Sequence, residues 1–286
     1  MSSHDELVRQ LEEDRERTVR EVEKIDKLIA QLKGIDGAED TLTTDLKGFS
    51  SERLLDWDWL FGGVIPTGST GILAGDPKVG KSTLVTQMAL CLAAGRTPFY
   101  DCHVHRSARV LYIAAEGARA AYQNRVKTAA RTLGISLTGS EASRWFIQQR
   151  HANDYMLGGR GLRKMIAETK PDLVVLDTLF FFTKGNENDA SDTKAHIMRP
   201  ARALTAEFGC GFLFVHHQTK ESAERKGPQR VRGSTALLGD CDYLLQLDAV
   251  AGDTVGNKRT LALSLTKYAA TRRWDLIYVP EEARFG

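Results

Sequence analysis

From residue 70 to residue 215, short apolar runs alternate with longer segments that mix apolar and polar residues. Apolar runs of this length, rich in β-branched residues, predict buried strands, and mixed segments of nine or more residues predict helices. In chain order these are strand 70–74, helix 81–94, strand 109–114, helix 119–133, helix 161–169, strand 173–177, helix 192–208 and strand 211–215. This alternation predicts βαβ units and a mostly parallel sheet covered by helices on both faces.

The pattern changes beyond Gly239. Three short strands are predicted there, at 243–247, 259–265 and 274–279, with only turns between them. Strands joined by turns pair in antiparallel fashion. We therefore expect an α/β fold with one mostly parallel, twisted sheet that continues into a C-terminal antiparallel extension.

The first 48 residues differ from the rest. Residues 5–33 contain no Gly or Pro, and apolar residues recur at helical three- and four-residue steps. Arg15 and Thr18 interrupt this seam, so the segment is either an imperfect coiled coil or a single amphipathic helix on the protein's own core or on a neighbouring subunit. The next residues are polar and contain several glycines, which predicts a linker. The expected organisation is an N-terminal amphipathic helix at 1–33 for assembly or docking, a linker at 34–48 and a globular α/β domain at 49–286.

Composition and charge exclude several classes of protein. Hydrophobic residues make up 42% of the chain and charged residues 27%, as in a globular protein rather than a disordered one. The net charge is only +2, so attraction to nucleic acid must come from a local patch. The four scattered cysteines include no CxxC pair, and no apolar run approaches the ~20 residues that span a bilayer. We expect a cytoplasmic protein with no membrane partner.

The strongest chemical signal is GDPKVGKS at 75–82, directly after an apolar strand and before a helix. In this GxxxxGKS pattern the glycines let backbone N–H groups surround a phosphate, and the helix N-terminus adds a favourable dipole. Lys81 is expected to reach the β- and γ-phosphates and Ser82 to bind Mg²⁺. A glycine-rich turn that matches by chance is the alternative. The predicted ATP-binding residues are Gly75, Asp76, Pro77, Lys78, Val79, Gly80, Lys81, Ser82 and Thr83.

Two other predicted strands end in carboxylates. The run LVVLD at 173–177 places Asp177 at the end of a buried strand, where it is expected to hold Mg²⁺. Glu116 follows the strand at 109–114, on the edge of the sheet where ligands bind. We expect Glu116 to act as general base on the attacking water, the alternative being a surface residue that caps the next helix.

Together these residues resemble the RecA-like P-loop ATPases, and most closely the RepA-type hexameric replicative helicases of plasmids and phages. The resemblance implies a ring with ATP held between subunits and single-stranded DNA in the central channel. It also implies that His217 senses the γ-phosphate, with His216 or Gln218, and it places Lys267 in the catalytic machinery. The residues that carry the resemblance are Ile65 to Pro66, Gly75 to Ser82, Ala115 to Gly117, Val174 to Thr178, His216 and His217, Arg232 to Ser234, and Lys267.

A basic segment follows the strand that carries His217. Between residues 220 and 232 five basic residues face only two acidic ones, and no aromatic residue is present to stack on bases. Such a segment suits the backbone of single-stranded DNA, the alternative being a solvated surface loop. The predicted DNA contacts are Lys220, Arg225, Lys226, Arg230 and Arg232.

The resemblance further implies an arginine that reaches into the neighbouring subunit's ATP site. In DnaB-type helicases it stands two residues after the lysine that matches Lys267, and this chain has Ala269 there. Arg232, Arg272 and Arg273 are the candidates for this inter-subunit finger, and Arg259 is a further one.

The favoured function is an ATP-driven, ring-forming motor on single-stranded DNA, such as the replicative DNA helicase of a plasmid, phage or integrated element. An ATP-gated recombination mediator that holds DNA without unwinding it is a second hypothesis. A P-loop kinase is a third, and the sensor strand and the basic segment argue against it.

Overall fold

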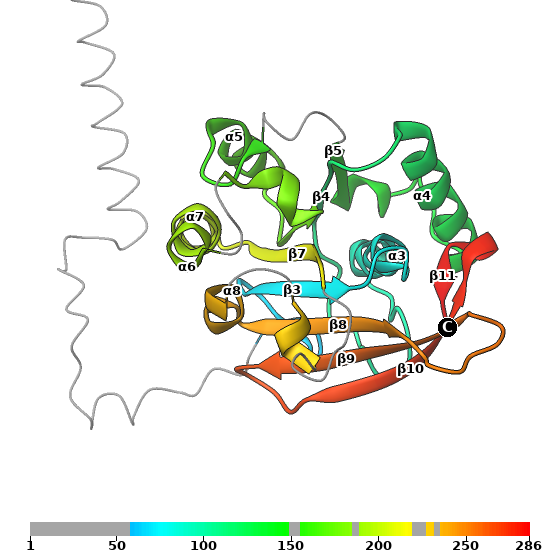
Figure 1. Ribbon diagram of the computed structural model, residues 1–286. Helices are drawn as coiled ribbons and strands as arrows, with labels where there is room; N and C mark the ends of the chain where they lie inside the picture. The colour runs from blue at the N-terminus through cyan, green and yellow to red at the C-terminus, as the bar shows by residue number, and fades with distance from the viewer. Residues whose placement is uncertain (1–57, 149–154, 185–188, 219–226, 232–234) are drawn as a thin grey trace, which may run out of the picture. The chain divides into compact units, whose positions relative to one another are not determined.

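The computed structural model describes residues 58–148, 155–184, 189–218, 227–231 and 235–286 (Figure 1). The helix and the linker predicted at 1–33 and 34–48 lie outside these residues. So do Lys220, Arg225, Lys226 and Arg232, so their predicted roles stay predictions.

One nine-stranded sheet organises the described part of the chain. Its strands, in sheet order, are β11 (Arg284–Phe285), β10 (Arg272–Val279), β9 (Lys258–Thr266), β8 (Tyr243–Ala249), β3 (Thr70–Gly75), β7 (Gly211–His217), β6 (Leu173–Asp177), β4 (Val110–Ala114) and β5 (Trp145–Gln148). The six strands from β8 to β5 are parallel, and β9, β10 and β11 pair in antiparallel fashion. This confirms the predicted α/β fold with its C-terminal antiparallel extension. A separate pair, β1 (Trp59–Phe61) and β2 (Ile65–Pro66), precedes β3.

Helices connect the parallel strands (Figure 1). They are α3 (Lys81–Ala94), α4 (Arg119–Leu133), α5 (Arg160–Thr169), α6 (Ala190–Thr193), α7 (Arg199–Phe208) and α8 (Thr235–Asp240). The short π-helix η4 (Lys194–Met198) joins α6 to α7, and short 3₁₀ turns lie at η1 (Ala142–Arg144), η3 (Leu179–Phe182), η5 (Gly227–Arg230) and η6 (Pro280–Glu282).

Two apolar cores cover the two faces of the sheet, because successive strand residues point to opposite sides. In β6, Val175 packs in the core with α3 and α4, whereas Val174 and Leu176 pack in the core with α5 and α7. Nearly every residue of α3 is buried, as in a helix enclosed by other elements. This burial fixes α3, and with it the loop that enters the helix.

Several elements differ from the sequence prediction, among them β1, β2, α8 and β11, which are six residues or fewer in length and were not predicted. The predicted single helix at 192–208 is α6, η4 and α7, and Pro200 lies in the first turn of α7. Proline has no N–H for a helical hydrogen bond, so a regular α-helix begins more easily at this point than it continues through it. The strand β5 was not predicted, since it is only four residues long and lies at the edge of the described sheet beside β4.

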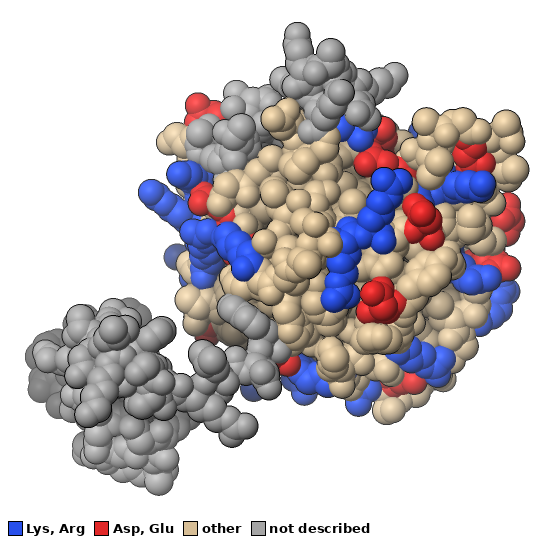
Figure 2. Space-filling model, turned by 90° about the horizontal axis from the view of Figure 1, so that it is seen from below, with Lys and Arg blue, Asp and Glu red and all other residues tan. Residues whose placement is uncertain are grey.

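The face shown in Figure 2 carries interspersed basic and acidic side chains. That distribution matches the near-neutral composition. Among the described helices, none is long and apolar enough to cross a membrane.

Candidate nucleotide site

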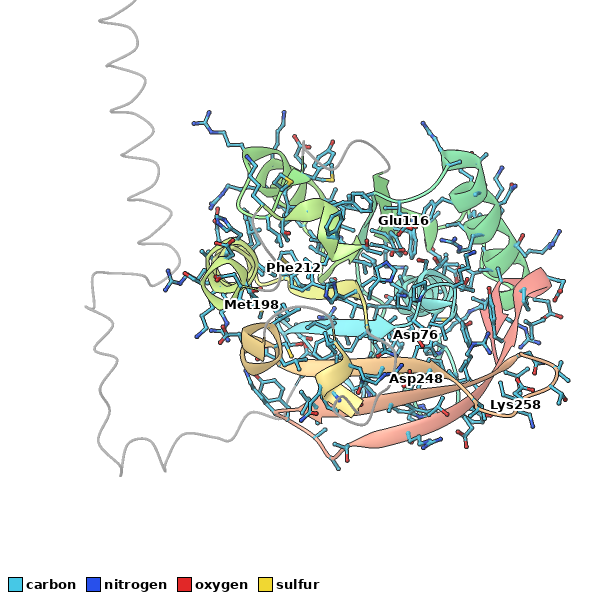
Figure 3. The ribbon with its side chains drawn as sticks, in the orientation of Figure 1. Asp76, Glu116, Met198, Phe212, Asp248 and Lys258 are labelled. Carbon is cyan, nitrogen blue, oxygen red and sulfur yellow. The ribbon has the colours of Figure 1, made fainter. Side chains whose placement is uncertain are left out.

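The parallel strands bring the predicted site residues to one edge of the sheet. Asp177 and His217 are the last residues of β6 and β7, and Asp76 and Glu116 are the first residue after β3 and the second after β4 (Figure 3). Segments far apart in the sequence therefore meet at the carboxyl ends of the strands, where ligands bind in α/β sheets.

Two glycines are required by the shape of the phosphate loop. A Cβ on Gly75 would lie 2.6 Å from the Leu247 carbonyl oxygen, so no side chain fits between β3 and β8 there. Gly80 has a φ of 110° and is the N-cap of α3, and a Cβ on it would lie 2.8 Å from the Phe285 ring. The loop thus passes directly into the N-terminus of α3, whose unpaired N–H groups favour an anion.

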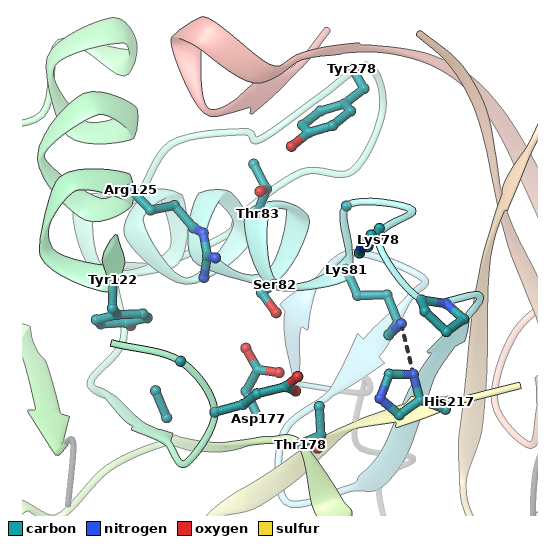
Figure 4. Close-up of a pocket in the computed structure, with 15 residues that line it drawn as sticks. Lys78, Lys81, Ser82, Thr83, Tyr122, Arg125, Asp177, Thr178, His217 and Tyr278 are labelled. Carbon is teal, nitrogen blue, oxygen red and sulfur yellow. Dashed lines mark hydrogen bonds between the residues drawn. The ribbon is translucent and has the colours of Figure 1, made fainter. Parts of the chain in front are cut away.

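Lys81 lies inside the phosphate loop. Its Nζ donates hydrogen bonds to the carbonyl oxygens of Gly75, at 3.0 Å, and Asp76, at 2.9 Å. It also lies 3.5 Å from His217 Nδ1 (Figure 4). Burial lowers the pKa of Lys81, and the nearby carboxylates of Asp177, Asp76 and Glu116 oppose this. The ammonium and the predicted sensor are therefore adjacent in the folded chain.

Asp177 is fixed by a hydrogen bond to one of its carboxylate oxygens. The Tyr112 hydroxyl donates a 2.6 Å hydrogen bond to Asp177 Oδ2, and both side chains are buried. Asp177 Oδ1 is buried and has no hydrogen-bond partner among the described residues. Burial raises the pKa of Asp177, and the Tyr112 hydrogen bond opposes this.

These observations fit the predicted metal ion. A buried carboxylate oxygen without a partner is costly unless it binds a ligand. In Figure 4 the Ser82 hydroxyl and the Asp177 carboxylate point toward each other across the pocket. A hydroxyl and a carboxylate are oxygen ligands of the kind that Mg²⁺ takes. Ser82 and Asp177 are therefore the residues that would hold Mg²⁺.

A cavity of about 500 Å³ connects these groups, a volume typical of small-molecule sites. Its lining brings together most of the residues predicted to bind ATP, hold the metal or act in catalysis, with Glu116 exposed at its side. Those that line it are Pro77, Lys78, Gly80, Lys81, Ser82, Thr83, Glu116, Asp177 and His217.

Sequence reasoning missed three residues of the lining. Tyr122 and Arg125 come from α4, and Tyr278 comes from β10. The Arg125 guanidinium lies 6.0 Å from the centre of the Tyr122 ring and points toward Ser82 (Figure 4). Tyr122 Oη, like Asp177 Oδ1, is buried without a hydrogen-bond partner in the described part of the chain. No local motif marks these residues, and only their spacing on an amphipathic helix or a short strand could have drawn attention to them.

Several predicted residues lie away from this pocket. Lys267 follows the end of β9, whose pairing with the start of β8 puts it at the opposite edge of the sheet, where its Nζ lies 2.9 Å from Asp242 Oδ1. Arg272 pairs with Asp101 at 3.5 Å, and Arg273 pairs with Asp275 at 3.7 Å. None of these three belongs to the described lining of the pocket, so the structure does not bring Lys267, predicted as catalytic, to the phosphate loop of its own chain, and the finger role of Arg272 and Arg273 stays a prediction.

Two arginines that were predicted to act elsewhere lie beside the phosphate loop of their own chain: Arg259, a candidate finger, and Arg230, a predicted DNA contact. Arg259 is buried and donates a 2.9 Å hydrogen bond from Nε to the Val79 carbonyl oxygen. Arg230 is 7% exposed and pairs with Asp76 and Asp248. The structure thus places Arg230 among carboxylates rather than on an accessible basic surface, which leaves little of its guanidinium for a DNA phosphate.

Comparison with known proteins agrees with this geometry. A family model described as an AAA domain matches residues 38–223, more than half of the chain. The chain belongs to this AAA domain family. Membership implies nucleotide binding, typically with Mg²⁺, and ATP hydrolysis.

One curated relative of this AAA domain protein is the DNA repair protein RadA of Brucella abortus (strain 2308). The two are 25% identical over 177 residues, which cover 61% of this chain and 33% of RadA. The chain therefore spans about a third of the length of that relative.

Three solved structures are similar to this AAA domain protein. A DnaB-like replicative helicase, described with its interactions with primase, has a TM-score of 0.61 at 13% identity, covering 97% of this chain and 75% of that one. A structure described as an ATPase domain has a TM-score of 0.57 at 13% identity, covering 91% of this chain and 96% of that one. The RadB recombinase has a TM-score of 0.51 at 18% identity, covering 77% and 90%. At these identities the likeness shows the fold alone, and it confirms the predicted RecA-like P-loop ATPase fold.

Proposed function

We propose that this AAA domain protein is an ATP-hydrolysing, ring-forming motor on single-stranded DNA, of the replicative DNA helicase class. The observation that carries the proposal is the meeting of Lys81, Asp177, Glu116 and His217 around one pocket of a fold similar to a DnaB-like replicative helicase over 97% of the chain. Phosphoryl transfer needs these parts: a cation over the phosphates, a metal ligand, a base and a sensor.

Each residue has a distinct role in the proposed reaction. Glu116 lines the pocket and accepts a proton from the water that attacks the γ-phosphate. Lys81 leaves its two loop carbonyls for the phosphate oxygens and stabilises their charge. When bound by Ser82 and Asp177, Mg²⁺ neutralises charge on the phosphate oxygens. Arg125, which points into the pocket, adds a second cation.

In a ring, the residues proposed to contact the ATP of a neighbouring subunit are Lys267, Arg232, Arg272 and Arg273. In a ring, a residue far from its own phosphate loop can lie near the loop of the next copy, and the position of Lys267 at the opposite sheet edge is consistent with this. The helix predicted at 1–33 is proposed to assist assembly. Lys220, Arg225, Lys226 and Arg232 are proposed to contact the DNA backbone.

A recombination mediator is the second candidate. The similarity to the RadB recombinase and to the DNA repair protein RadA favours it. It shares ATP hydrolysis and DNA binding with the first candidate, and differs in that it does not separate strands.

The test combines steady-state ATP hydrolysis, strand displacement on a forked duplex, and native mass. The parent protein is expected to hydrolyse ATP faster with single-stranded DNA, to unwind the fork and to have a multiple of the 31.7 kDa chain mass. Hydrolysis without displacement would favour the mediator, and hydrolysis indifferent to DNA would contradict both. Native mass of residues 41–286 in parallel tests the role of the N-terminal helix.

Two variants separate the roles at the site. Glu116→Gln keeps shape and loses the base, so hydrolysis should fall by ~10²-fold or more while nucleotide binding persists. Lys81→Ala should lose both hydrolysis and nucleotide binding, because it removes the ammonium that lies inside the phosphate loop. If Glu116→Gln hydrolyses ATP at the parent's rate, Glu116 is not the general base.

A further inference from the structure

A polar cluster with a buried centre of Gln218, Arg230 and Gln246 lies beside the phosphate pocket. Its members are Asp76, Gln218, Arg230, Gln246 and Asp248, and we refer to them as the Arg230 cluster. They come from four places: the phosphate loop, the end of β7, the turn η5 and the strand β8. Figure 3 shows Asp76 and Asp248 at the neighbouring ends of β3 and β8. None of the five belongs to the described lining of the pocket, and Asp76 directly precedes the lining residue Pro77.

Arg230 connects two carboxylates of this cluster. Its Nη1 lies 2.8 Å from Asp248 Oδ1, and its Nη2 lies 3.3 Å and 3.4 Å from the two carboxylate oxygens of Asp76. The Arg230 side chain is 8% exposed, whereas the aspartates are 39% and 33% exposed. A planar guanidinium suits this arrangement because it offers several donors in a fixed fork.

Further hydrogen bonds connect Gln218 and the turn η5 to the ends of β3 and β8. The backbone N–H of Gln218 donates a hydrogen bond to the Gly75 carbonyl oxygen at 3.2 Å, and the side-chain Nε2 of Gln218 donates to Asp248 Oδ1 at 2.5 Å. Gln246 Nε2 donates to the Gly227 carbonyl oxygen at 2.9 Å. Gln218 and Val231 form an antiparallel bridge.

Asp76 is the residue that the cluster shares with the nucleotide site. Its carbonyl oxygen accepts the hydrogen bond from Lys81 Nζ, and its carboxylate pairs with Arg230. When Lys81 turns toward a phosphate, the backbone of Asp76 loses that hydrogen bond. A change in the position of Asp76 would then move Arg230, because the Asp76 carboxylate and the Arg230 guanidinium are paired. Arg230 belongs to the turn η5, so η5 would move with it.

We propose that Arg230 is a positioning residue for ATP binding: it holds the phosphate loop through Asp76 and transmits nucleotide binding to η5. It takes this role in place of a DNA contact. The inference rests on the nucleotide site of the proposed function and needs neither DNA binding nor a ring.

The experiment compares Arg230→Gln, Arg230→Lys and Asp248→Asn with the full-length parent. Arg163→Gln is the matched control, because Arg163 also pairs with a carboxylate, Glu207, but lies on α5 away from the site. Calorimetry gives the affinity for ATPγS with Mg²⁺. Hydrogen–deuterium exchange, with and without ATPγS, follows peptides that contain residues 75–79 and 227–231.

In the parent, ATPγS should slow exchange in both peptides. Arg230→Gln should weaken ATPγS binding about 10-fold, the effect of losing one charge-assisted hydrogen bond, and the peptide with 227–231 should no longer respond to nucleotide. Asp248→Asn should reduce the response in the same peptide. Arg230→Lys, which keeps the charge without the fork, should recover part of the affinity. Arg163→Gln should match the parent.

Three results would overturn the proposal. The first is a parent protein in which ATPγS leaves exchange at 227–231 unchanged. The second is an Arg230→Gln protein with the parent's affinity and response. The third is normal ATPγS binding in Arg230→Gln together with weaker binding of single-stranded DNA and a salt slope reduced by ~0.7, which would make Arg230 a phosphate contact.

Two controls keep these results interpretable. If Arg230→Gln fails to fold, Arg230→Lys and Asp248→Asn carry the test, and normal nucleotide responses in both would also overturn the proposal. If the parent binds ATPγS with the expected exchange response but ignores DNA, the motor function fails and the role of Arg230 stands.

Discussion

At the scale of single residues, Asp177 shows how the fold positions the side chain proposed to hold the metal ion. Tyr112 lies on β4 and Asp177 on the adjacent β6, and the hydroxyl of the first fixes one carboxylate oxygen of the second. The other oxygen is left buried without a hydrogen-bond partner from the described residues. Positioning of a ligand by a neighbour in this way commonly affects metal affinity ~10-fold or more.

Tyr112→Phe tests this arrangement. Removing the hydroxyl takes away the hydrogen bond that keeps the pKa of Asp177 from rising further under burial. The carboxylate should then be harder to ionise, and Mg²⁺ should bind ~10-fold more weakly in the presence of ADP, with the loss greater at lower pH. Titration calorimetry of ADP with and without Mg²⁺ measures the difference.

Tyr243→Phe is the matched control for that experiment. Tyr243 is also fully buried, and its hydroxyl donates a 3.1 Å hydrogen bond to the Phe212 carbonyl oxygen on the same sheet. Both variants should lose about 1 kcal/mol of unfolding free energy. Only Tyr112→Phe should change Mg²⁺ affinity, and an equal effect of both variants would mean that Tyr112 has no specific role toward the metal.

At the scale of secondary structure, local pattern predicted much of the fold. The helices 81–94 and 119–133 and the strand 173–177 have the predicted bounds, because Gly95 and Gly134 end the two helices and the strand is an uninterrupted apolar run that closes with Asp177. The phosphate loop was equally predictable, since its chemistry is contained in eight consecutive residues.

What the pattern could not predict depends on pairing between distant segments. Arg230 has the sequence context of an exposed basic segment, and its burial depends on Asp76 and Asp248, which lie 154 and 18 residues away. Arg125 and Tyr278 reach the pocket from α4 and β10 for the same reason. Short-range periodicity contains no information about which strand ends become neighbours.

The basic segment from 220 to 232 is predicted to contact single-stranded DNA. Replacing Lys220, Arg225 and Lys226 with Ala should weaken binding of single-stranded DNA uniformly across sequences and leave ATP binding intact. The slope of log K against log salt should flatten by ~0.7 for each lost contact, and so by about 2 in total. Filter binding at several salt concentrations measures the slope.

A charge-matched control distinguishes contacts from net charge. Replacing Lys127, Arg131 and Lys164, which are exposed on α4 and α5, removes the same charge elsewhere. This control should keep nearly the parent's slope. If the two triple variants lose affinity equally, the basic segment is a solvated loop.

At the scale of the whole molecule, the four cysteines report on the integrity of both cores. Cys91 and Cys102 lie in the core with α3 and α4, and Cys210 and Cys241 lie in the other; all four are buried and free. Burial raises the pKa of Cys91 to about 12 and that of Cys210 and Cys241 to about 11, and it also raises the pKa of Cys102. Because the thiolate is the reactive form, native thiols should be very unreactive at pH 8.

Thiol labelling at pH 8 should therefore proceed through opening of the fold. A thiol with a pKa of about 11 is ionised in only ~1 of 1,000 molecules at this pH, roughly 200-fold less than an unperturbed cysteine. ATPγS at ~100 times its Kd stabilises the folded state by about 2.7 kcal/mol. Cys91 lies on α3, the helix that follows the phosphate loop. If the core opens as a unit, ATPγS should therefore slow the labelling of Cys91 by ~100-fold. Mass spectrometry of the labelled peptides gives the rate for each cysteine. Slowing at Cys91 without slowing at Cys210 would show that the two cores open separately, and rapid labelling of any of the four in the native protein would contradict the burial on which the prediction rests.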